Sequence, residues 1–428
     1  MLNQNTVRTL SRRQREPSWI LQKRLDAFAD FKRLAVPNAS RGTATQINTR
    51  FIDITKVDPL QGLGNITLPT TPEGVIVSSF QKALTNPTTE KIIKQHFWTA
   101  ASPTQDKFSA LHAAFFNEGV LIHVKRNTRI ETPFLISCDQ ATQNKLMHTL
   151  IVAEAGSAIT IIDQSGGDTL PPTRAVLDAA TQAFYSTFVE IIAYEGAQVN
   201  YVSVQELPMN ARHFATKKAI VGKEASVFWI DCCLGSGFTQ ATTASTLAAP
   251  GSSTKNWGFF FGKEDQYFDL NSVTIHAAPH TASQMLTKGV LDDKAKTSYR
   301  GLICIEEGAH HSDGHQKEET LLIGTDAAVD AAPILEIKND DVKCSHGVTI
   351  GQVDTEKLFY MMARGLDEAT AKVKIIEGFF EPMIIQIKND TVCDHIRERI
   401  AQRLASFIAQ DRTPHYQTRT LLVKPLLD

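Results

Sequence analysis

The sequence predicts a mainly β protein, built as a stacked β-solenoid with helical segments before and after it. Between about residue 105 and residue 350, short β-rich runs follow one another without intervening helices. In several runs a small residue follows an acidic or glycine-bearing turn, as at Ala158, Ala197 and Ala225. Small residues fit the tight corners of a solenoid, in which each repeat forms one coil. A β-sandwich would also give short strands separated by turns, so this alternative stays open.

The segment before the β-rich part is expected to be helical. The stretch SRRQREPSWILQKRLDAFADF has apolar residues at helical spacing, with Pro17 at a plausible helix start. Shorter helices are expected around Ser78 to Leu84 and around Thr89 to Thr99. We therefore expect an N-terminal helical region over residues 1–104 and a β core over residues 105–350.

The chain becomes helical again after the β core. Three aspartates stand where their side chains can cap helices: Asp354, Asp367 and Asp390. Pro382 is expected to kink or end the second of these helices. The third carries one apolar stripe: Ile396, Ile400, Leu404, Phe407 and Ile408. We expect a C-terminal helical domain over residues 351–411, followed by a tail over residues 412–428 that is partly disordered.

The composition is that of an ordinary globular protein, with 42% hydrophobic and 21% charged residues among 428. The formal net charge of -2 gives no basic excess, so neither nucleic acid nor an anionic membrane is expected as a partner. No apolar run approaches the roughly 20 residues that a membrane-spanning helix needs. The six cysteines have no paired spacing, which in a chain of this size predicts reduced thiols and a cytoplasmic location.

The stretch KNDDVKCSHG places a thiol and an imidazole two residues apart, at Cys344 and His346. On an extended strand these side chains share one face, about 7 Å apart along the strand. That spacing is too long for a direct hydrogen bond, but it suits two ligands of one ion or cluster, or a site that another chain completes. The alternative is that Cys344 is a small buried hydrophobe and His346 a core-edge residue.

A second polar cluster lies in AHHSDGHQKEE and contains His310, His311 and His315 beside Asp313. Such side chains could hold zinc, iron or nickel, so the three histidines are weak metal candidates. The alternative is a solvated corner at the edge of the β body.

The chain lacks the usual signatures of hydrolytic and nucleotide-binding sites. GFFFGKED has one residue too few between its glycines for a phosphate loop, and no Ser or Thr follows Lys263. GxSxG, HExxH and GxGxxG are absent as well. We therefore expect no nucleotide to be bound by this chain and no enzymatic activity of its own.

Two stretches resemble a known family. The run LLIGTDAAVDAAPILEIKNDDVKCSHGVTIGQVDTEKLFYMMARGLDEATA is similar to the signature region of the SufB/SufD family of iron–sulfur cluster assembly, and EPSWILQKRLDAF resembles that family's N-terminal segment. The resemblance covers roughly residues 10 to 410. It implies a right-handed parallel β-helix flanked by helical regions, working as an assembly scaffold subunit.

Within that family the chain resembles SufD more than SufB. SufB-like chains carry a sulfur-accepting cysteine in the turn after LLIG, where this chain has Ala327. They also follow the motif histidine with glutamate, where this chain has Gly347. The missing thiol implies that this chain does not accept persulfide sulfur at that position.

The resemblance also implies roles for particular residues. His346 would face a SufB-like partner and help to build a transient iron–sulfur cluster, or to hold iron, at the interface, with Cys344 as a neighbouring candidate. The C-terminal helices would dock a SufC-like ATPase, which binds the ATP. The partner-binding candidates there are Leu358, Phe359, Tyr360, Arg364 and Gly365.

Three other functions stay open at this stage. The chain could be a self-pairing SufB/SufD-like homodimeric scaffold. It could be a β-helix enzyme acting on polysaccharide, although such enzymes line a groove with acidic and aromatic side chains, and no such ladder is evident in the sequence. It could also be a purely structural partner in which Cys344 and His346 only pack.

Overall fold

The computed structural model describes residues 2–37, 53–61, 68, 71–138, 144–166 and 182–411. The chain divides into two compact units, Met1–Gln352 and Val353–Asp428. The expected tail over residues 412–428 lies outside the described residues. Each unit is described by itself below.

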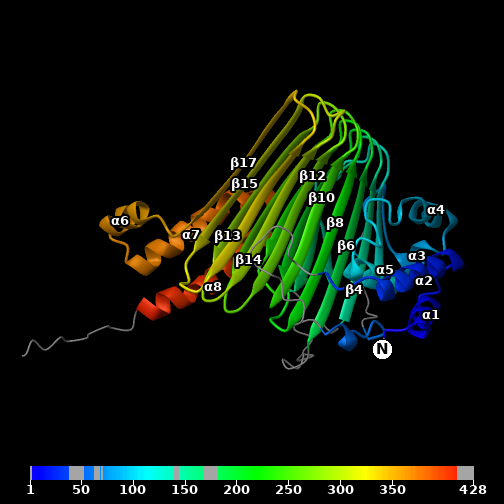
Figure 1. Cartoon of the computed structure of the whole chain (residues 1–428), viewed down its shortest axis with the longest axis horizontal. Helices are drawn as coiled ribbons and strands as arrows, with labels where there is room; N and C mark the ends of the chain where they lie inside the picture. The colour runs from blue at the N-terminus through cyan, green and yellow to red at the C-terminus, as the bar shows by residue number, and fades with distance from the viewer. Residues whose placement is uncertain are drawn as a thin grey trace, which may run out of the picture. The chain divides into compact units, whose positions relative to one another are not determined.

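Two sheets form the body of the first unit (Figure 1). The nine-stranded sheet contains β1 (Val75–Ser79), β2 (Glu118–Val124), β4 (Asn144–Ala153), β6 (Ala183–Ala193), β8 (Ala211–Val221), β10 (Phe238–Leu247), β12 (Tyr267–His276), β14 (Lys296–Ile305) and β16 (Ala328–Ile337), in that order. The eight-stranded sheet contains β3 (Phe134–Cys138), β5 (Ala158–Gly166), β7 (Gln198–Glu206), β9 (Ser226–Cys233), β11 (Ser253–Gly262), β13 (Ala282–Leu291), β15 (Ser312–Leu322) and β17 (Val342–Gly351).

Successive strands along the chain alternate between the two sheets, so each coil adds one strand to each. All pairings are parallel except that of β1 with β2. Phe238 pairs with Tyr267 and Tyr267 with Lys296, so each of these coils takes 29 residues. The parallel pairing of every second strand confirms the predicted solenoid and excludes the β-sandwich, whose sheets are antiparallel.

The coils turn at a corner where a left-handed residue precedes a small buried one. The left-handed residues are Gly156, Gly196, Glu224, Gly251, His280 and His311. The small residues are Ser157, Ala197, Ala225, Ser252, Thr281 and Ser312, which the register places in one column. The prediction is therefore confirmed for Ala197 and Ala225. It is wrong by one position for Ala158, because the Ser157 hydroxyl donates to Glu154 O (2.6 Å) and closes that turn.

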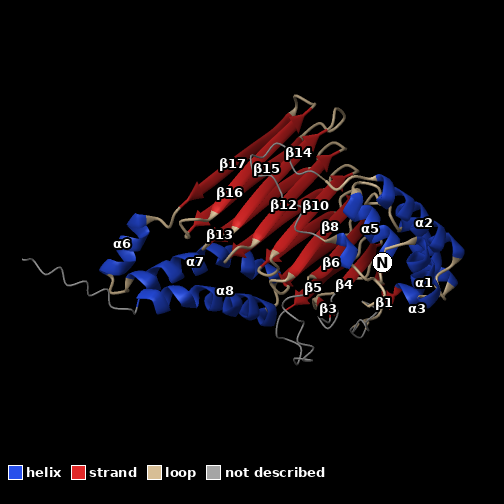
Figure 2. Ribbon diagram, turned by 60° about the horizontal axis from the view of Figure 1, so that its bottom comes forward, coloured by secondary structure: helices blue, strands red, loops and turns tan. Residues whose placement is uncertain are grey.

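Two apolar layers cover the two faces of the nine-stranded sheet. Between the sheets, side chains from both pack together, with Tyr201 and Trp229 among the largest. On the outer face of the β2–β6 end, the N-terminal helices pack against strand residues such as Leu150 and Phe184. Figure 2 shows these helices gathered over that end of the sheet. Strands with both faces buried explain the near-continuous apolar runs in β4 and β6.

The N-terminal helices are α1 (Gln4–Arg13), α2 (Ser18–Arg33), α3 (Phe80–Ala83), α4 (Pro87–His96) and α5 (Lys107–Phe115), with a 3-10 turn at Ile54–Lys56. The start of α2 after Pro17 follows the prediction. The segment expected to be a helix from Ser78 begins as strand β1 and becomes α3 only at Phe80. α5 lies inside the range expected to be β core. Of the helices that the structure describes, none combines the length and the apolar character needed to cross a membrane.

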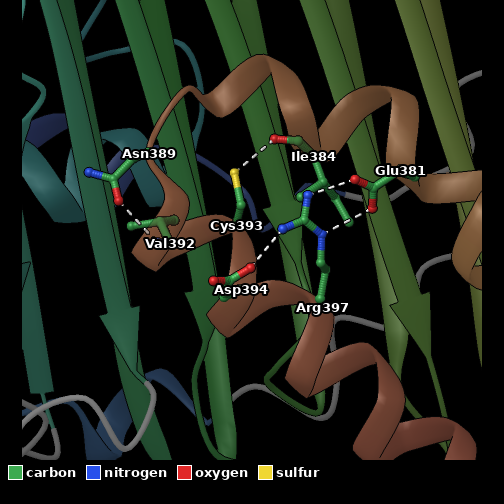
Figure 3. Close-up of polar contacts among 7 residues, drawn as sticks. All are labelled: Glu381, Ile384, Asn389, Val392, Cys393, Asp394 and Arg397. Carbon is green, nitrogen blue, oxygen red and sulfur yellow. Dashed lines mark hydrogen bonds and ion pairs between the residues drawn. The ribbon is translucent and has the colours of Figure 1, made fainter.

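The second unit is helical, with α6 (Thr355–Ala363), α7 (Glu368–Ile384), a 3-10 turn (Ile385–Ile387) and α8 (Asp390–Asp411). Asp354 and Asp367 cap α6 and α7 as predicted, since their carboxylates accept backbone N–H bonds. α8 is capped by Asn389 instead of Asp390, because the Asn389 side chain accepts the Val392 N–H at 3.0 Å (Figure 3).

Further contacts hold α7 and α8 together (Figure 3). Pro382 stands inside α7, which ends two residues later. The Cys393 thiol donates to Ile384 O at 3.2 Å, and Arg397 binds both carboxylate oxygens of Glu381 at 2.6 and 3.1 Å. The predicted stripe on α8 is buried at Ile396, Ile400 and Leu404. The side chains of Phe407 and Ile408 lie outside the described part of the helix.

Candidate functional site

The last coil of the solenoid leaves both sheets open at one end. β16 is the outermost strand of the nine-stranded sheet and β17 that of the eight-stranded sheet. No residue of either strand is fully buried. Ile334, Ile337 and Ile350 are 39–45% exposed. Unpaired edge strands with apolar side chains are surfaces on which another chain can pair.

Cys344 points from β17 toward the inside of this last coil. Together with Val342 it packs against the buried side chains of Met285 and Ile303. Burial raises the pKa of the Cys344 thiol, and the charge of Asp313 raises it further. At neutral pH the side chain is therefore a thiol, and it must release a proton to bind a metal ion.

His346 is exposed on the same strand. It is two residues from Cys344, so both side chains belong to one face of the extended strand. Its register partner is Gln316 of β15. Because the His346 side chain is exposed, the imidazole can be reached from outside this unit.

The three histidines of the second cluster have separate partners. His310 lies 3.0 Å from Asn339 Nδ2. His311 stacks on His280 with ring centroids 4.8 Å apart, because both occupy the left-handed corner position of successive coils. It also pairs with Asp341 at 3.0 Å.

His315 belongs to β15 and points outward. Its ring nitrogens contact Asp313 Oδ1 at 2.7 Å and Ser345 Oγ at 2.6 Å. The structure therefore does not bring His310, His311 and His315 to one point. In the part of the chain that the structure describes, no three His, Cys, Asp or Glu side chains are grouped to hold a metal ion.

The C-terminal candidates lie on and just after α6. No residue of α6 is buried within the structure, and Phe359 and Tyr360 are 74% and 58% exposed. Arg364 places its guanidinium carbon 4.9 Å from the centre of the Tyr360 ring. Gly365 follows with a φ of 97°, which only glycine adopts freely and which ends the helix. Leu358 is half-buried. Phe359 and Tyr360 therefore leave exposed apolar surface on α6, although consecutive residues point to different sides of a helix.

The outer face of the nine-stranded sheet contains a cavity of about 160 Å³. Its wall includes Asp269, which is buried and paired with Arg300. A column of aromatic rings runs beside it: Phe184, Phe214, Phe238 and Tyr267. The sequence did not reveal this column.

The carboxylates of this cavity are held in structural contacts. Gln240 donates to Asp269 at 2.7 Å, and Asp106 accepts the Ser109 N–H at 2.8 Å as the cap of α5. Glycoside hydrolysis needs one carboxyl group as acid and another as base or nucleophile. The cavity therefore gives the polysaccharide-enzyme alternative no support.

Two polar residues inside the last coils were missed by the sequence reasoning. Gln316 and Glu318 are 3% and 0% exposed and point inward from β15. The segment containing them begins at an exposed corner with His310 and His311, as the alternative expected, and continues as strand β15 from Ser312. The available signal was the strand's period of two, because every second residue of a strand points inward and Gln316 and Glu318 are two residues apart. The polar character of both residues hid that pattern.

Comparison with known proteins gives a consistent result. The family model described as the SUF system FeS cluster assembly SufBD core domain matches residues 134–379, and that for the SufBD protein N-terminal region matches residues 36–136. An iron–sulfur cluster assembly SufBD family protein of Staphylococcus saprophyticus is 27% identical over 89% of this chain and 88% of its own length. Proteins of the same description from Staphylococcus haemolyticus and Staphylococcus aureus are 26% identical with the same coverage.

Proposed function

Since this chain belongs to the SufBD family of iron–sulfur cluster assembly proteins, we propose that it acts as a SufD-like scaffold subunit in the cytoplasm. It pairs with a SufB-like paralogue and binds a SufC-like ATPase, and a nascent cluster is built where the two β-helices meet. The observation that carries the proposal is the open last coil, on which His346 is exposed and Cys344 is half-buried.

The choice of SufD over SufB rests on two positions. Ala327 stands in the turn where SufB-like chains carry a sulfur-accepting cysteine, and its side chain packs against an apolar cluster that contains Phe268. Gly347 follows the motif histidine. Because position 327 has no thiol, the sulfur comes from the paired subunit. This chain contributes ligands for iron and holds them in place at the contact between the two chains.

Pairing with a second β-helix is supported by the chemistry of the last coil. β16 and β17 offer backbone groups along open sheet edges, and Ile334, Ile337 and Ile350 offer apolar area. A matching coil of another chain would satisfy both kinds of group, as in strand addition. A site at such a seam is complete only when both chains are present.

The ATPase contact is assigned to α6 and the residues just after it. Phe359 and Tyr360 are the exposed apolar side chains there, and Arg364 lies over the Tyr360 ring. The sequence contains no phosphate loop of its own, which agrees with ATP being bound and hydrolysed by the partner. ATP-driven movement of that partner would act on the seam through this unit.

The ligand chemistry of His346 and Cys344 suits iron. Imidazole and thiolate both bind iron, and the thiol proton is released when the Cys344 sulfur–iron bond forms. The raised pKa of Cys344 makes that release harder than for an exposed cysteine. His346 is therefore the stronger candidate, and the Cys344 thiol is secondary.

The test replaces His346 in a complex co-purified with both partners. His346→Ala should leave the complex assembled and lower the absorbance of the reconstituted cluster about tenfold, a typical effect of losing a metal ligand or its support. The matched control is His310→Ala, which removes another exposed imidazole and should leave the cluster yield unchanged.

Normal cluster yield from His346→Ala would overturn the assignment. Cys344→Ala should reduce the yield less, and an equal reduction would make the thiol a full ligand. If the chain is stable and carries a cluster in the absence of any partner, the self-pairing homodimeric scaffold would be favoured over the heterodimer.

A further inference from the structure

Two buried polar side chains lie one coil below the open end. Gln316 and Glu318 point inward from β15, and both are more than nine-tenths buried. Neither polar atom of the Gln316 amide has a hydrogen-bond partner. Glu318 Oε1 accepts a hydrogen bond from the Thr320 hydroxyl, whereas its Oε2 has no partner.

Such groups are costly in a protein interior. Each buried polar atom without a partner destabilises the fold by about 1–3 kcal/mol. No ion pair of Glu318 with a lysine, arginine or histidine occurs among the described residues. Native proteins retain few unpaired buried groups, and those they retain serve a function or bind water or an ion. The unpaired atoms of Gln316 and Glu318 can therefore be satisfied by a water molecule or by an ion.

The surrounding residues leave room for the Gln316 amide. A Cβ atom at Gly301 would lie 2.0 Å from Gln316 Nε2, so only glycine at 301 allows this side chain to lie across the interior. On the side toward the sheet centre, the register partners of Gln316 and Glu318 are Met285 and Thr287. Neither carries a charge that could neutralise a carboxylate.

On the open side the register partner of Gln316 is His346. Neighbouring strands lie about 4.8 Å apart, and alternate residues on one strand about 7 Å apart. Glu318, Gln316 and His346 therefore occupy adjacent positions on one interior face. Their side chains therefore project from two neighbouring strands of the eight-stranded sheet.

We propose that Glu318 Oε2, Gln316 Oε1 and the His346 imidazole form a holding site for a divalent cation. Carboxylate, amide oxygen and imidazole together suit Fe²⁺ and Mn²⁺. The cation is identified as ferrous iron only through the proposed function, on which this choice rests. The site lies inside the chain itself and therefore precedes any ligand that a partner supplies.

These three donor groups suit a cation that is bound for a time and then released to another site. The set contains only one histidine and one carboxylate, which agrees with the absence of a larger ligand group among the described residues. Water or the partner subunit completes the coordination. Burial, together with the charge of Glu319, raises the pKa of Glu318 to about 7, while the Thr320 hydroxyl lowers it. The empty site can thus hold a neutral carboxyl group, which limits the cost of burying it.

The experiment titrates the full chain alone with Mn²⁺ and follows free Mn²⁺ by electron paramagnetic resonance. The wild-type chain should bind Mn²⁺ below about 1 mM. Glu318→Gln keeps the size of the side chain and should weaken binding at least tenfold. His346→Ala should weaken it several-fold.

The matched control is Glu319→Gln. Glu319 follows Glu318 on the same strand, but its side chain points outward and contacts Lys317 at 2.7 Å. Its replacement removes a nearby charge but no ligand, and should change Mn²⁺ binding much less than Glu318→Gln does. Gln316→Leu tests the amide oxygen separately, in surroundings that already contain Met285. Thermal unfolding of each variant shows that the fold is kept.

Absence of Mn²⁺ binding by the wild-type chain, or equal binding by Glu318→Gln, would overturn the site. A loss with Glu319→Gln as large as with Glu318→Gln would overturn it too. The titration needs neither a partner nor a cluster, so its outcome is independent of the complex. A chain that binds Mn²⁺ through Glu318 but gives normal clusters with His346→Ala would keep the cation site and refute the proposed seam.

Discussion

His148 Nε2 lies 3.0 Å from Glu190 Oε1, and both side chains are fully buried. Glu190 also accepts the backbone N–H groups of Trp98, Ala100 and Ala101. Trp98 has a φ of 64°, a conformation that such a bulky residue seldom adopts. One carboxylate of β6 therefore holds the turn after α4 in place and fixes the N-terminal helices to the solenoid.

Glu190→Ala should lower the free energy of unfolding by about 3–5 kcal/mol, because it leaves His148 and three N–H groups buried without their partner. Urea denaturation followed by circular dichroism measures the loss. Glu195→Ala, which removes an exposed carboxylate paired with Lys223, is the control and should change little. Equal effects of the two substitutions would contradict the anchoring role of Glu190.

His276 should make stability depend on pH. Burial lowers its pKa from 6.5 to about 4, although the charge of Asp313 opposes the shift. Its ring nitrogens contact Thr281 Oγ1 at 2.7 Å and Ser283 Oγ at 2.8 Å. Between pH 6.5 and pH 4 the unfolded chain binds a proton at this position that the folded chain does not, so the contribution is complete above pH 6.5 and is lost as the pH falls.

Replacing His276 by Gln should remove this dependence. The slope of unfolding free energy against pH should become shallower by up to about 1.4 kcal/mol per pH unit in that window. Urea denaturation of both proteins from pH 4 to pH 8 measures the difference. Identical slopes would show that His276 titrates alike in the folded and unfolded chains.

Cys344 should be the first to react with iodoacetamide among the cysteines whose side chains are described. Cys232, Cys233, Cys304 and Cys393 are buried, whereas Cys344 is half-exposed. Because its pKa is raised, its labelling rate should keep rising at pH values where an ordinary cysteine is already mostly thiolate. Mass spectrometry of the labelled peptides follows each site.

A SufB-like partner should protect Cys344 from this labelling if the last coil is the pairing surface. Labelling of Cys393, which belongs to the other unit, serves as the internal reference. Unchanged labelling of Cys344 in the assembled complex would place the seam elsewhere.

Phe359→Ser should weaken co-purification of a SufC-like ATPase at least tenfold, since exposed aromatic side chains often carry much of an interface's binding energy. The substitution should leave the unfolding free energy within about 0.5 kcal/mol, because Phe359 is 74% exposed. Ile385→Ser is the matched control, an exposed apolar residue in the same unit. Full ATPase recovery with Phe359→Ser would remove α6 from the contact.

The repeating part of the fold could be predicted because each coil repeats the same local requirements. The small residues Ala197 and Ala225 allowed the tight corners to be predicted, and the short apolar runs allowed the strands to be predicted. Ser157 was missed because a buried hydroxyl also meets the corner's size limit, once it bonds to the carbonyl three residues earlier. α5 was missed because nearly every one of its side chains is buried, so it lacks the one-sided apolar stripe that marks a surface helix.

The candidate site was predictable only in part. The spacing of Cys344 and His346 placed them on one face, and the exposure of His346 agrees with a site open to a partner. Glu318 could not be found from residue type, since its inward position depends on the register of β15 against β13 and β17. Asn389 took the cap expected of Asp390 because both residue types cap helices and only the backbone decides between them.

The equal coils between Phe238 and Lys296 make the length of this protein adjustable in whole steps. Removing 29 residues there would delete one coil and rejoin equivalent positions, which would bring the last coil about 4.8 Å closer to the N-terminal helices. A deletion one residue longer or shorter would turn the inward side chains of the next strand outward. Relatives that differ in length within this stretch should therefore differ by complete coils. What changes among them would be the distance between the first and the last coil of the solenoid.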